Sequence, residues 1–230
     1  MTRREGAGRA WSDDVARRPG GYAVTWTQTV EGPDAQKLFD TRVSELTPSM
    51  NVLDLGCGDG AFTLSVAKHA RHVTGVDFSE GMLANARRAA EAQGMENVTF
   101  VHAHAREDAG LTRGAFNVAY TRRGPNITVV VPALVRAGGV LLGLHPLERD
   151  AGGLRDSGLS VVRYERLDDL LRFPTVTDLA RYLQRTPGMP DVRQPEHADL
   201  LRALAREHAH PEGGYAKPVR WLLWEARVPG

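Results

Sequence analysis

Residues 52–60 read VLDLGCGDG, an apolar run that is interrupted by a carboxylate and followed by bare backbone. The acid is Asp54, and the glycines Gly56, Gly58 and Gly60 stand at every second position after it. Glycine allows positive φ and lets a ligand approach the backbone closely. The segment therefore indicates either a tight strand-to-helix turn alone or a turn that binds a ligand.

Strand and helix candidates alternate on both sides of this turn. Apolar runs predict strands at 52–55, 72–76, 98–101, 116–120 and 140–144. Helices are expected at 33–46, at 61–70, from a Ser79 cap to Gly94, and at 126–136. This alternation favours a parallel sheet with helices on both faces.

A second acid limits the class of ligand. Asp77 ends the strand at 72–76, 21 residues after Gly56, where a carboxylate can accept hydrogen bonds from two ribose hydroxyls. The spacing G-C-G-D-G misses the dinucleotide fingerprint G-x-G-x-x-G, and Asp54 would repel a pyrophosphate. A carboxylate there suits a ligand with an ammonium group, such as the amino-acid moiety of S-adenosylmethionine.

VLDLGCGDG, followed by VTGVDFSEGMLANAR, resembles motifs I and II of the class I S-adenosylmethionine-dependent methyltransferases. LVRAGGVLLG is similar to the family's L-(K/R)-P-G-G segment, with Ala137 where proline is usual. The similarity covers roughly residues 45–145. It implies a Rossmann-like, doubly wound α/β fold with a seven-stranded, mostly parallel sheet. The last strand would be antiparallel and inserted beside the sixth, and WLLWEARV near the carboxyl end fits it.

The resemblance also implies a binding site for S-adenosylmethionine, with S-adenosylhomocysteine as the product. Asp54 would hold the ligand ammonium, directly or through water. Gly56 and Gly58 would let the methionine part lie against the backbone. Asp77 would bind the ribose diol, and Phe78 would lie against adenine.

Two positions near the expected cofactor site need separate interpretation. Cys57 belongs to the expected cofactor-binding turn and falls where the family commonly has a small residue or cysteine. We interpret it as a packing residue and not as a nucleophile, because no partner base is evident. After the third strand the family often has Gly-Asp-Ala, whereas this chain has Ala103-His104-Ala105. His104 either accepts a hydrogen bond from the adenine amino group or is a surface histidine. The amide of Ala105 could meet an adenine ring nitrogen.

The segment AYTRRGPN at 119–126 differs from the Asn/Asp-Pro-Pro-Tyr/Phe of methyltransferases that act on adenine or amide nitrogen. Tyr120 either lines the cofactor pocket or serves as a general base or hydrogen-bond donor. Arg122 and Arg123 either bind a substrate or cofactor carboxylate or phosphate, or are solvated. These three residues are the catalytic candidates. Trp26 either covers the substrate or plugs the core.

Composition excludes several classes of protein. With 42% hydrophobic residues, 25% charged residues and a net charge of +1, no global field favours nucleic acid or a membrane surface. One cysteine permits no intramolecular disulfide, and no histidine spacing suggests a metal, so we expect no metal. No signal-peptide core or membrane-spanning run is evident, so we expect a soluble, cytoplasmic protein.

The same pattern predicts how the chain is organised. Residues 1–20 lack an apolar period and are expected to be a flexible tail, and 21–230 a single domain. Two helices, at 175–186 and 195–209, interrupt two late strands at 159–166 and 219–228. We interpret 167–217 as a helical insertion that either forms a lid over the substrate or adds packing at the sheet edge.

The expected function is methyl transfer from S-adenosylmethionine to a small molecule by in-line displacement, in a monomer or weak dimer. An RNA methyltransferase acting on rRNA or tRNA is the first alternative. Arg122, Arg123 and the arginines of the insertion support it, whereas the near-zero net charge opposes it. The second alternative is a protein that binds S-adenosylmethionine without catalysis. The replacement of the family's usual acid by His104 is compatible with this alternative.

Overall fold

The computed structural model describes residues 3–18, 22–104, 110–124, 127–128, 131–147, 154, 156–186 and 189–230. The chain divides into two compact units. The first unit comprises Met1–Tyr22, Ala35–Leu167 and Trp221–Gly230, and the second comprises Ala23–Asp34 and Asp168–Arg220. No helix within the described ranges is long and apolar enough to cross a lipid bilayer.

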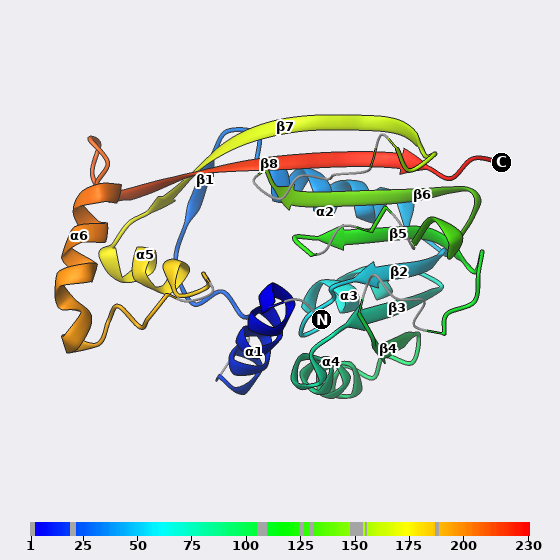
Figure 1. The fold of residues 1–230 in the computed structure, drawn as a ribbon, viewed down its shortest axis with the longest axis horizontal. Coiled ribbons are helices and arrows are strands. Elements are labelled where there is room, and N and C mark those ends of the chain that lie inside the picture. Colours follow the sequence, from blue (N-terminus) through cyan, green and yellow to red (C-terminus); the bar gives the residue numbers. More distant parts are fainter. Residues whose placement is uncertain are drawn as a thin grey trace. The chain divides into compact units, whose positions relative to one another are not determined.

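Five parallel strands lie side by side in the first unit (Figure 1). They are β2 (Asn51–Leu55), β3 (His72–Asp77), β4 (Val98–His102), β5 (Phe116–Arg122) and β6 (Val135–Pro146). Their order in the sheet is β4-β3-β2-β5-β6, so the direction of winding reverses between β2 and β5. In open α/β sheets, ligands bind at the carboxyl ends of the strands at this switch point.

The remaining strands complete a sheet in the order β1-β7-β8-β6-β5-β2-β3-β4. β8 (Tyr215–Arg227) pairs antiparallel with β6, from Val140 opposite Arg227 to Pro146 opposite Trp221. The expected antiparallel last strand is thus confirmed, and it lies between β6 and β7 (Ser160–Phe173). The sheet has eight strands instead of seven, because the three-residue β1 (Thr29–Glu31) adds to β7.

Three helices expected from the sequence are present: α2 (Ala35–Leu46) precedes β2, α3 (Ala61–Ala67) connects β2 to β3, and α4 (Glu80–Ala92) connects β3 to β4. α4 begins after Ser79, whose hydroxyl accepts a hydrogen bond from the Met82 amide at 3.2 Å, as expected for a helix cap. Buried strand residues and Trp224 of β8 form the core between the layers. Trp224 lies flat against Gly143, where an added Cβ would come within 2.3 Å of its ring.

The amino-terminal segment differs from the expected tail because Arg3–Arg17 forms helix α1. Val15 is 1% exposed, and the Asn85 side chain of α4 donates a hydrogen bond to the Ala16 carbonyl at 3.0 Å. Trp11 lies one turn before Val15, and its ring centroid is 5.8 Å from that of Tyr22. Two apolar residues among arginines and glycines are too few for a recognisable helical period, so the sequence pattern missed this helix.

The helix expected at 126–136 is also wrong in the part that the structure describes. Val131–Ala133 forms a single 3-10 turn, η1, and β6 already begins at Val135, which pairs with Phe116 of β5. Residues 125, 126, 129 and 130 lie outside the described ranges. Pro132 lacks a backbone N–H for an α-helical hydrogen bond, and pairing with β5 from Val135 onward ends any helix there.

The second unit contains α5 (Val176–Leu183), the 3-10 turn η2 (Pro195–His197) and α6 (Ala198–His208). The two expected helices are therefore present between β7 and β8. Their core consists of Leu171, Phe173, Leu179 and Leu183. The unit's range 168–220 is close to the expected insertion, to which the structure adds residues 23–34. The lid role stays a prediction.

Candidate functional site

The glycine turn after β2 has the conformation that only glycine adopts easily. Gly56, Gly58 and Gly60 have φ values of 78°, 56° and 77°. At Gly60 an added Cβ would lie 2.8 Å from the Cβ of Ala86, so α3 and α4 approach too closely for any side chain. The amides of Gly56 and Cys57 both donate to the Val76 carbonyl, at 2.8 and 3.1 Å. These bonds tie the turn to the end of β3.

Asp77 connects this turn to the start of α4. Its side chain is only 6% exposed, one oxygen accepts from the Gly58 amide at 2.9 Å, and the other accepts from the Ser79 amide at 2.9 Å. Burial raises the pKa of Asp77, and these amide hydrogen bonds oppose the rise. A carboxylate oxygen can accept more than one hydrogen bond, so a hydroxyl pair can still bind here.

Asp54 lies at the switch point, opposite Tyr120 in the pairing of β2 with β5. Its Oδ2 accepts from the Thr63 hydroxyl at 2.7 Å and from the Tyr120 hydroxyl at 3.1 Å. Burial raises the pKa of Asp54 to about 6, although both hydrogen bonds favour the ionised form. A buried carboxylate with this donor set suits a cationic group and would penalise an anion.

The Tyr120 side chain is fully buried and packs against the rings of Phe39 and Phe62, edge to face with both. Burial, and then the charge of Asp54, raises the pKa of Tyr120 well above its ordinary value. The phenol therefore stays protonated and donates to Asp54. This geometry supports a positioning role for Tyr120 and works against a role as a general base.

Cys57 occupies a similar environment. Burial, and then the charges of Asp54 and Asp77, raises the pKa of the Cys57 thiol well above its ordinary value. Its sulfur also packs closely on Gly75 of β3, where an added Cβ would be 3.0 Å away. A thiol in this state is a poor nucleophile, which agrees with the packing interpretation.

Aromatic rings follow Asp77 on the side of the sheet where β4 ends. The Phe78 ring lies 6.3 Å from the ring of His104, centroid to centroid. His102, for which the sequence pattern predicted no role, has Nε2 3.0 Å from the Phe78 carbonyl oxygen. Ala105 lies outside the described residues.

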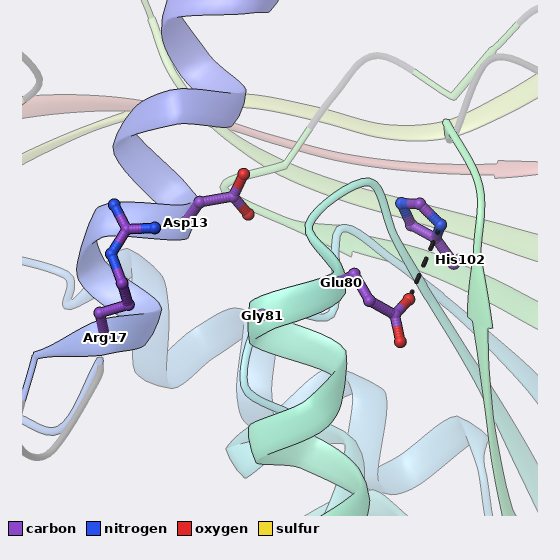
Figure 2. Close-up of a pocket in the computed structure, with 5 residues that line it drawn as sticks. All are labelled: Asp13, Arg17, Glu80, Gly81 and His102. Atoms are coloured by element: carbon purple, nitrogen blue, oxygen red, sulfur yellow. Dashed lines mark ion pairs between the residues drawn. The ribbon is translucent and has the colours of Figure 1, made fainter.

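An open pocket of about 450 Å³ adjoins this aromatic group. Figure 2 shows Asp13 and Arg17 of α1 on one side of it, and Glu80, Gly81 and His102 on the other. His102 Nδ1 lies 3.7 Å from a Glu80 carboxylate oxygen. The pocket therefore opens beside the loop that carries Asp77 and Phe78.

The amino-terminal segment covers the glycine turn, which no local pattern indicated. A Cβ on Gly58 would lie 3.1 Å from the Tyr22 ring, and the Tyr22 amide donates to Asp59 Oδ2 at 3.1 Å. The Ser79 hydroxyl donates to Asp13 of α1 at 2.5 Å. Thr63 was also missed, although its place one turn into the helix that follows the glycines could have identified it.

The two arginines at the end of β5 have different surroundings. Arg122 forms a bidentate ion pair with Asp40 of α2, at 2.7 and 2.9 Å, and lies 5.0 Å over the Phe62 ring. The structure thus gives its guanidinium a partner within the chain. Arg123 has φ of 64°, a conformation that is uncommon for a side chain of this size and that occurs at functional sites.

Trp26 belongs to the second unit and packs on that unit's core. Its ring centroid is 5.8 Å from that of Tyr182, and the Arg185 guanidinium lies 5.3 Å over the indole. The indole nitrogen donates to Gln28 at 2.7 Å. These contacts fit the core-plugging interpretation, and the substrate-covering role stays a prediction.

Among the residues that the structure describes, no group of three or more His, Cys, Asp or Glu side chains could hold a metal ion. The groups that do lie together are two buried carboxylates, the glycine turn and a pair of aromatic rings. They fit a ligand with a cationic amino-acid end, a ribose and an aromatic base.

Comparisons with known proteins identify a methyltransferase domain in this part of the chain. Residues 52–136 match the family model described as a methyltransferase domain. The 23S rRNA (uracil(1939)-C(5))-methyltransferase RlmD of Klebsiella pneumoniae is 34% identical over 139 residues. The match covers 54% of this chain and 31% of that protein, so this relative is about three times longer than the region it shares.

Two solved structures are similar to the chain over most of its length. A functionally unknown protein from Deinococcus radiodurans R1 has a TM-score of 0.64 and 26% identity, covering 96% of this chain and 100% of its own. A putative methyltransferase from Bacillus halodurans C-125 has a TM-score of 0.61 and 17% identity, covering 84% and 98%. The second likeness concerns the fold alone. The family model thus identifies a methyltransferase domain at residues 52–136, and the chain shares its fold with the putative methyltransferase.

Proposed function

We propose that the protein binds S-adenosylmethionine at the carboxyl ends of β2, β3 and β5 and transfers its methyl group to a small-molecule acceptor. The observation that carries this proposal is the hydrogen bond from the Gly58 amide to Asp77. It brings the glycine turn and the candidate ribose acid into one site. The buried Asp54, near that turn, then supports a ligand that is cationic and not a pyrophosphate.

Each residue of the site has a defined task in this proposal. Asp54, held by Thr63 and Tyr120, binds the ligand ammonium, and Asp77 accepts the ribose hydroxyls. Phe78 packs against adenine. The cofactor supplies an activated methyl group on a sulfonium, so the chain chiefly aligns the acceptor and excludes water. Tyr120, whose raised pKa keeps the phenol protonated, does not act as a general base, and such a displacement does not require one.

RNA methylation is the second candidate function, and the RlmD relative is the observation that favours it. Small-molecule methylation is preferred because the chain has a net charge of +1 and shows no RNA-binding module. The third candidate function is that of a sensor, which would bind S-adenosylmethionine at the same site without transferring its methyl group.

One experiment separates the three functions. S-adenosylmethionine is titrated calorimetrically, and its labelled methyl group is then followed into extract fractionated into RNA, protein and metabolites. Label in the metabolite fraction supports the proposal, and label in RNA supports the second candidate. Binding without label in any fraction supports the sensor. Binding of NAD in place of S-adenosylmethionine would contradict the cofactor assignment itself.

The ionisation of Asp54 should make cofactor binding depend on pH. Because its pKa is raised to about 6, the carboxylate is ionised above that pH and attracts the ligand ammonium. Affinity for S-adenosylhomocysteine should therefore be constant above pH 7 and fall by up to about tenfold per pH unit below pH 6. Asp54→Asn removes this ionisation, so its weaker binding should stay flat over the same range in calorimetry. An equally steep fall in the variant would assign the titration to another group.

Tyr22 should stabilise the bound cofactor by covering the glycine turn. Tyr22→Ala removes an aromatic face from Gly58, and affinity for S-adenosylhomocysteine should fall by roughly 1 kcal/mol, about fivefold. Trp26→Ala, which removes an aromatic residue from the other unit, is the matched control and should leave the cofactor affinity unchanged. Tighter binding by Tyr22→Ala would mean that the ring occupies the place of the ligand.

A further inference from the structure

The outer edge of β7 is the longest open strand edge in the described part of the chain. β7 runs from Ser160 to Phe173, and β8 follows it in the sheet on one side. On the other side, the described strands give it a partner only at 170–172, where β1 pairs. Figure 1 shows β7 as an outermost strand of the sheet. Open edges of this length are sites where a further strand can add.

Exposed apolar side chains gather on this same stretch. Among the described residues, five large hydrophobic side chains are exposed, and three of them are Val161, Val162 and Tyr164, at 42%, 57% and 37%. Natural edges are often protected by charges of one sign, which repel a second copy. Here the segment SVVRYERLD at 160–168 holds two arginines and two aspartate or glutamate residues, so it carries no net charge.

The charges are arranged so that the segment complements itself. When two copies pair antiparallel with Tyr164 opposite Tyr164, each Arg163 lies opposite Glu165 of the other copy, and Val161 lies opposite Leu167. Arg163 and Glu165 already share one face, since they form an ion pair at 2.7 Å within the strand. Opposite charges directly across a strand pair stabilise it.

Neighbouring registers lack this match. A shift of two residues places Arg163 opposite Arg163 in one direction and Glu165 opposite Glu165 in the other. A shift of one residue places Arg163 opposite Tyr164 or opposite Arg166, and it also moves side chains to the other face. Among these neighbouring registers, only the one centred on Tyr164 places opposite charges across from one another.

We propose that residues 161–167 of β7 form an isologous dimer interface with a second copy of this chain, in the register centred on Tyr164. The contact is a twofold symmetric β-sheet extension. Because seven residues per chain bury less area than a standard interface, the dimer is weak and forms at high protein concentration.

Charge reversal tests the register. In sedimentation equilibrium, the wild-type mass should rise with concentration from 25.1 kDa towards twice that value. Arg163→Glu and Glu165→Arg each place like charges opposite one another and should each remain monomeric. A mixture of these two variants should form a heterodimer, and the double variant R163E/E165R should dimerise again. Both side chains are partly exposed, at 30% and 43%, and unchanged melting curves would show that the variants fold.

A cysteine at the symmetry axis gives an independent readout. In the proposed register the two residues at position 164 are directly opposite, about 4.5–5.5 Å apart between Cα atoms, within the range for a disulfide. Tyr164→Cys should therefore form a covalent dimer under mild oxidation. In Val162→Cys the two cysteines would be roughly 13 Å apart along the strand, so this matched control should not cross-link. A wild-type chain that stays monomeric at all concentrations, or equal cross-linking at 162 and 164, would overturn the proposal.

Discussion

Replacing Arg42 with leucine should lower the free energy of unfolding by about 1–3 kcal/mol, because the arginine side chain is 32% exposed but its loss leaves a buried carboxylate without its partner. Arg42 of α2 donates two hydrogen bonds to Glu225 of β8, at 2.8 and 3.0 Å, and these bonds raise the pKa of the arginine. Glu225 has a side chain that is only 4% exposed. Without Arg42, this buried carboxylate would lose its charged hydrogen-bond partner. Chemical denaturation at neutral pH measures the loss.

Two further variants identify the source of this loss. Arg42 also contacts Glu45 at 3.0 Å, but that carboxylate is 56% exposed, so Glu45→Ala should cost at most about 1 kcal/mol. The double variant R42L/E225L should recover most of the stability, because neither charge is then left alone. If the double variant is as unstable as Arg42→Leu, packing and not the uncompensated carboxylate explains the loss.

The part of the site that was predictable is local in sequence. The glycines and Asp54 fall within nine residues, and Asp77 follows at the end of the next strand, so their proximity could be predicted from these short segments. Parallel pairing of β2 with β3 and β5 then places them at one sheet edge, as the alternating pattern implies. The strand β8 was predictable from its apolar run, and its antiparallel direction was implied by the family resemblance.

The remaining features depend on contacts between distant residues. Nothing near Arg122 in the sequence indicates that Asp40, 82 residues earlier, forms a bidentate pair with it. Tyr22 reaches Gly58 only because α1 packs on α4 through isolated residues such as Val15. The three-residue β1 is too short for any period to be recognised. Tertiary contacts of this kind produce no local sequence pattern, so they could not be predicted from the sequence.

Asp77→Ala should weaken the binding of S-adenosylhomocysteine by roughly 1–3 kcal/mol, about 5-fold to 150-fold, because the ribose hydroxyls lose a buried acceptor. The substitution also leaves the amides of Gly58 and Ser79 without the carboxylate that accepts from both at 2.9 Å. Part of the loss of affinity will therefore come from a less well ordered glycine turn and not from the missing contact with ribose. Calorimetric titration gives the total, and thermal melting gives the loss of stability.

A comparison of ligands separates the direct contact from the loosened turn. An analogue of S-adenosylhomocysteine without ribose hydroxyls should bind the wild type much more weakly than S-adenosylhomocysteine does. For Asp77→Ala the two compounds should bind nearly equally, because the carboxylate that accepts from the hydroxyls is already absent. Asn97→Ala serves as the control for stability. Asn97 donates to the Ala67 and Ala70 carbonyls and stands before β4, so its loss should lower the melting temperature without changing the ligand preference. If the hydroxyls contribute equally to binding in the wild type and in Asp77→Ala, the ribose contact lies elsewhere and the assignment of Asp77 is wrong.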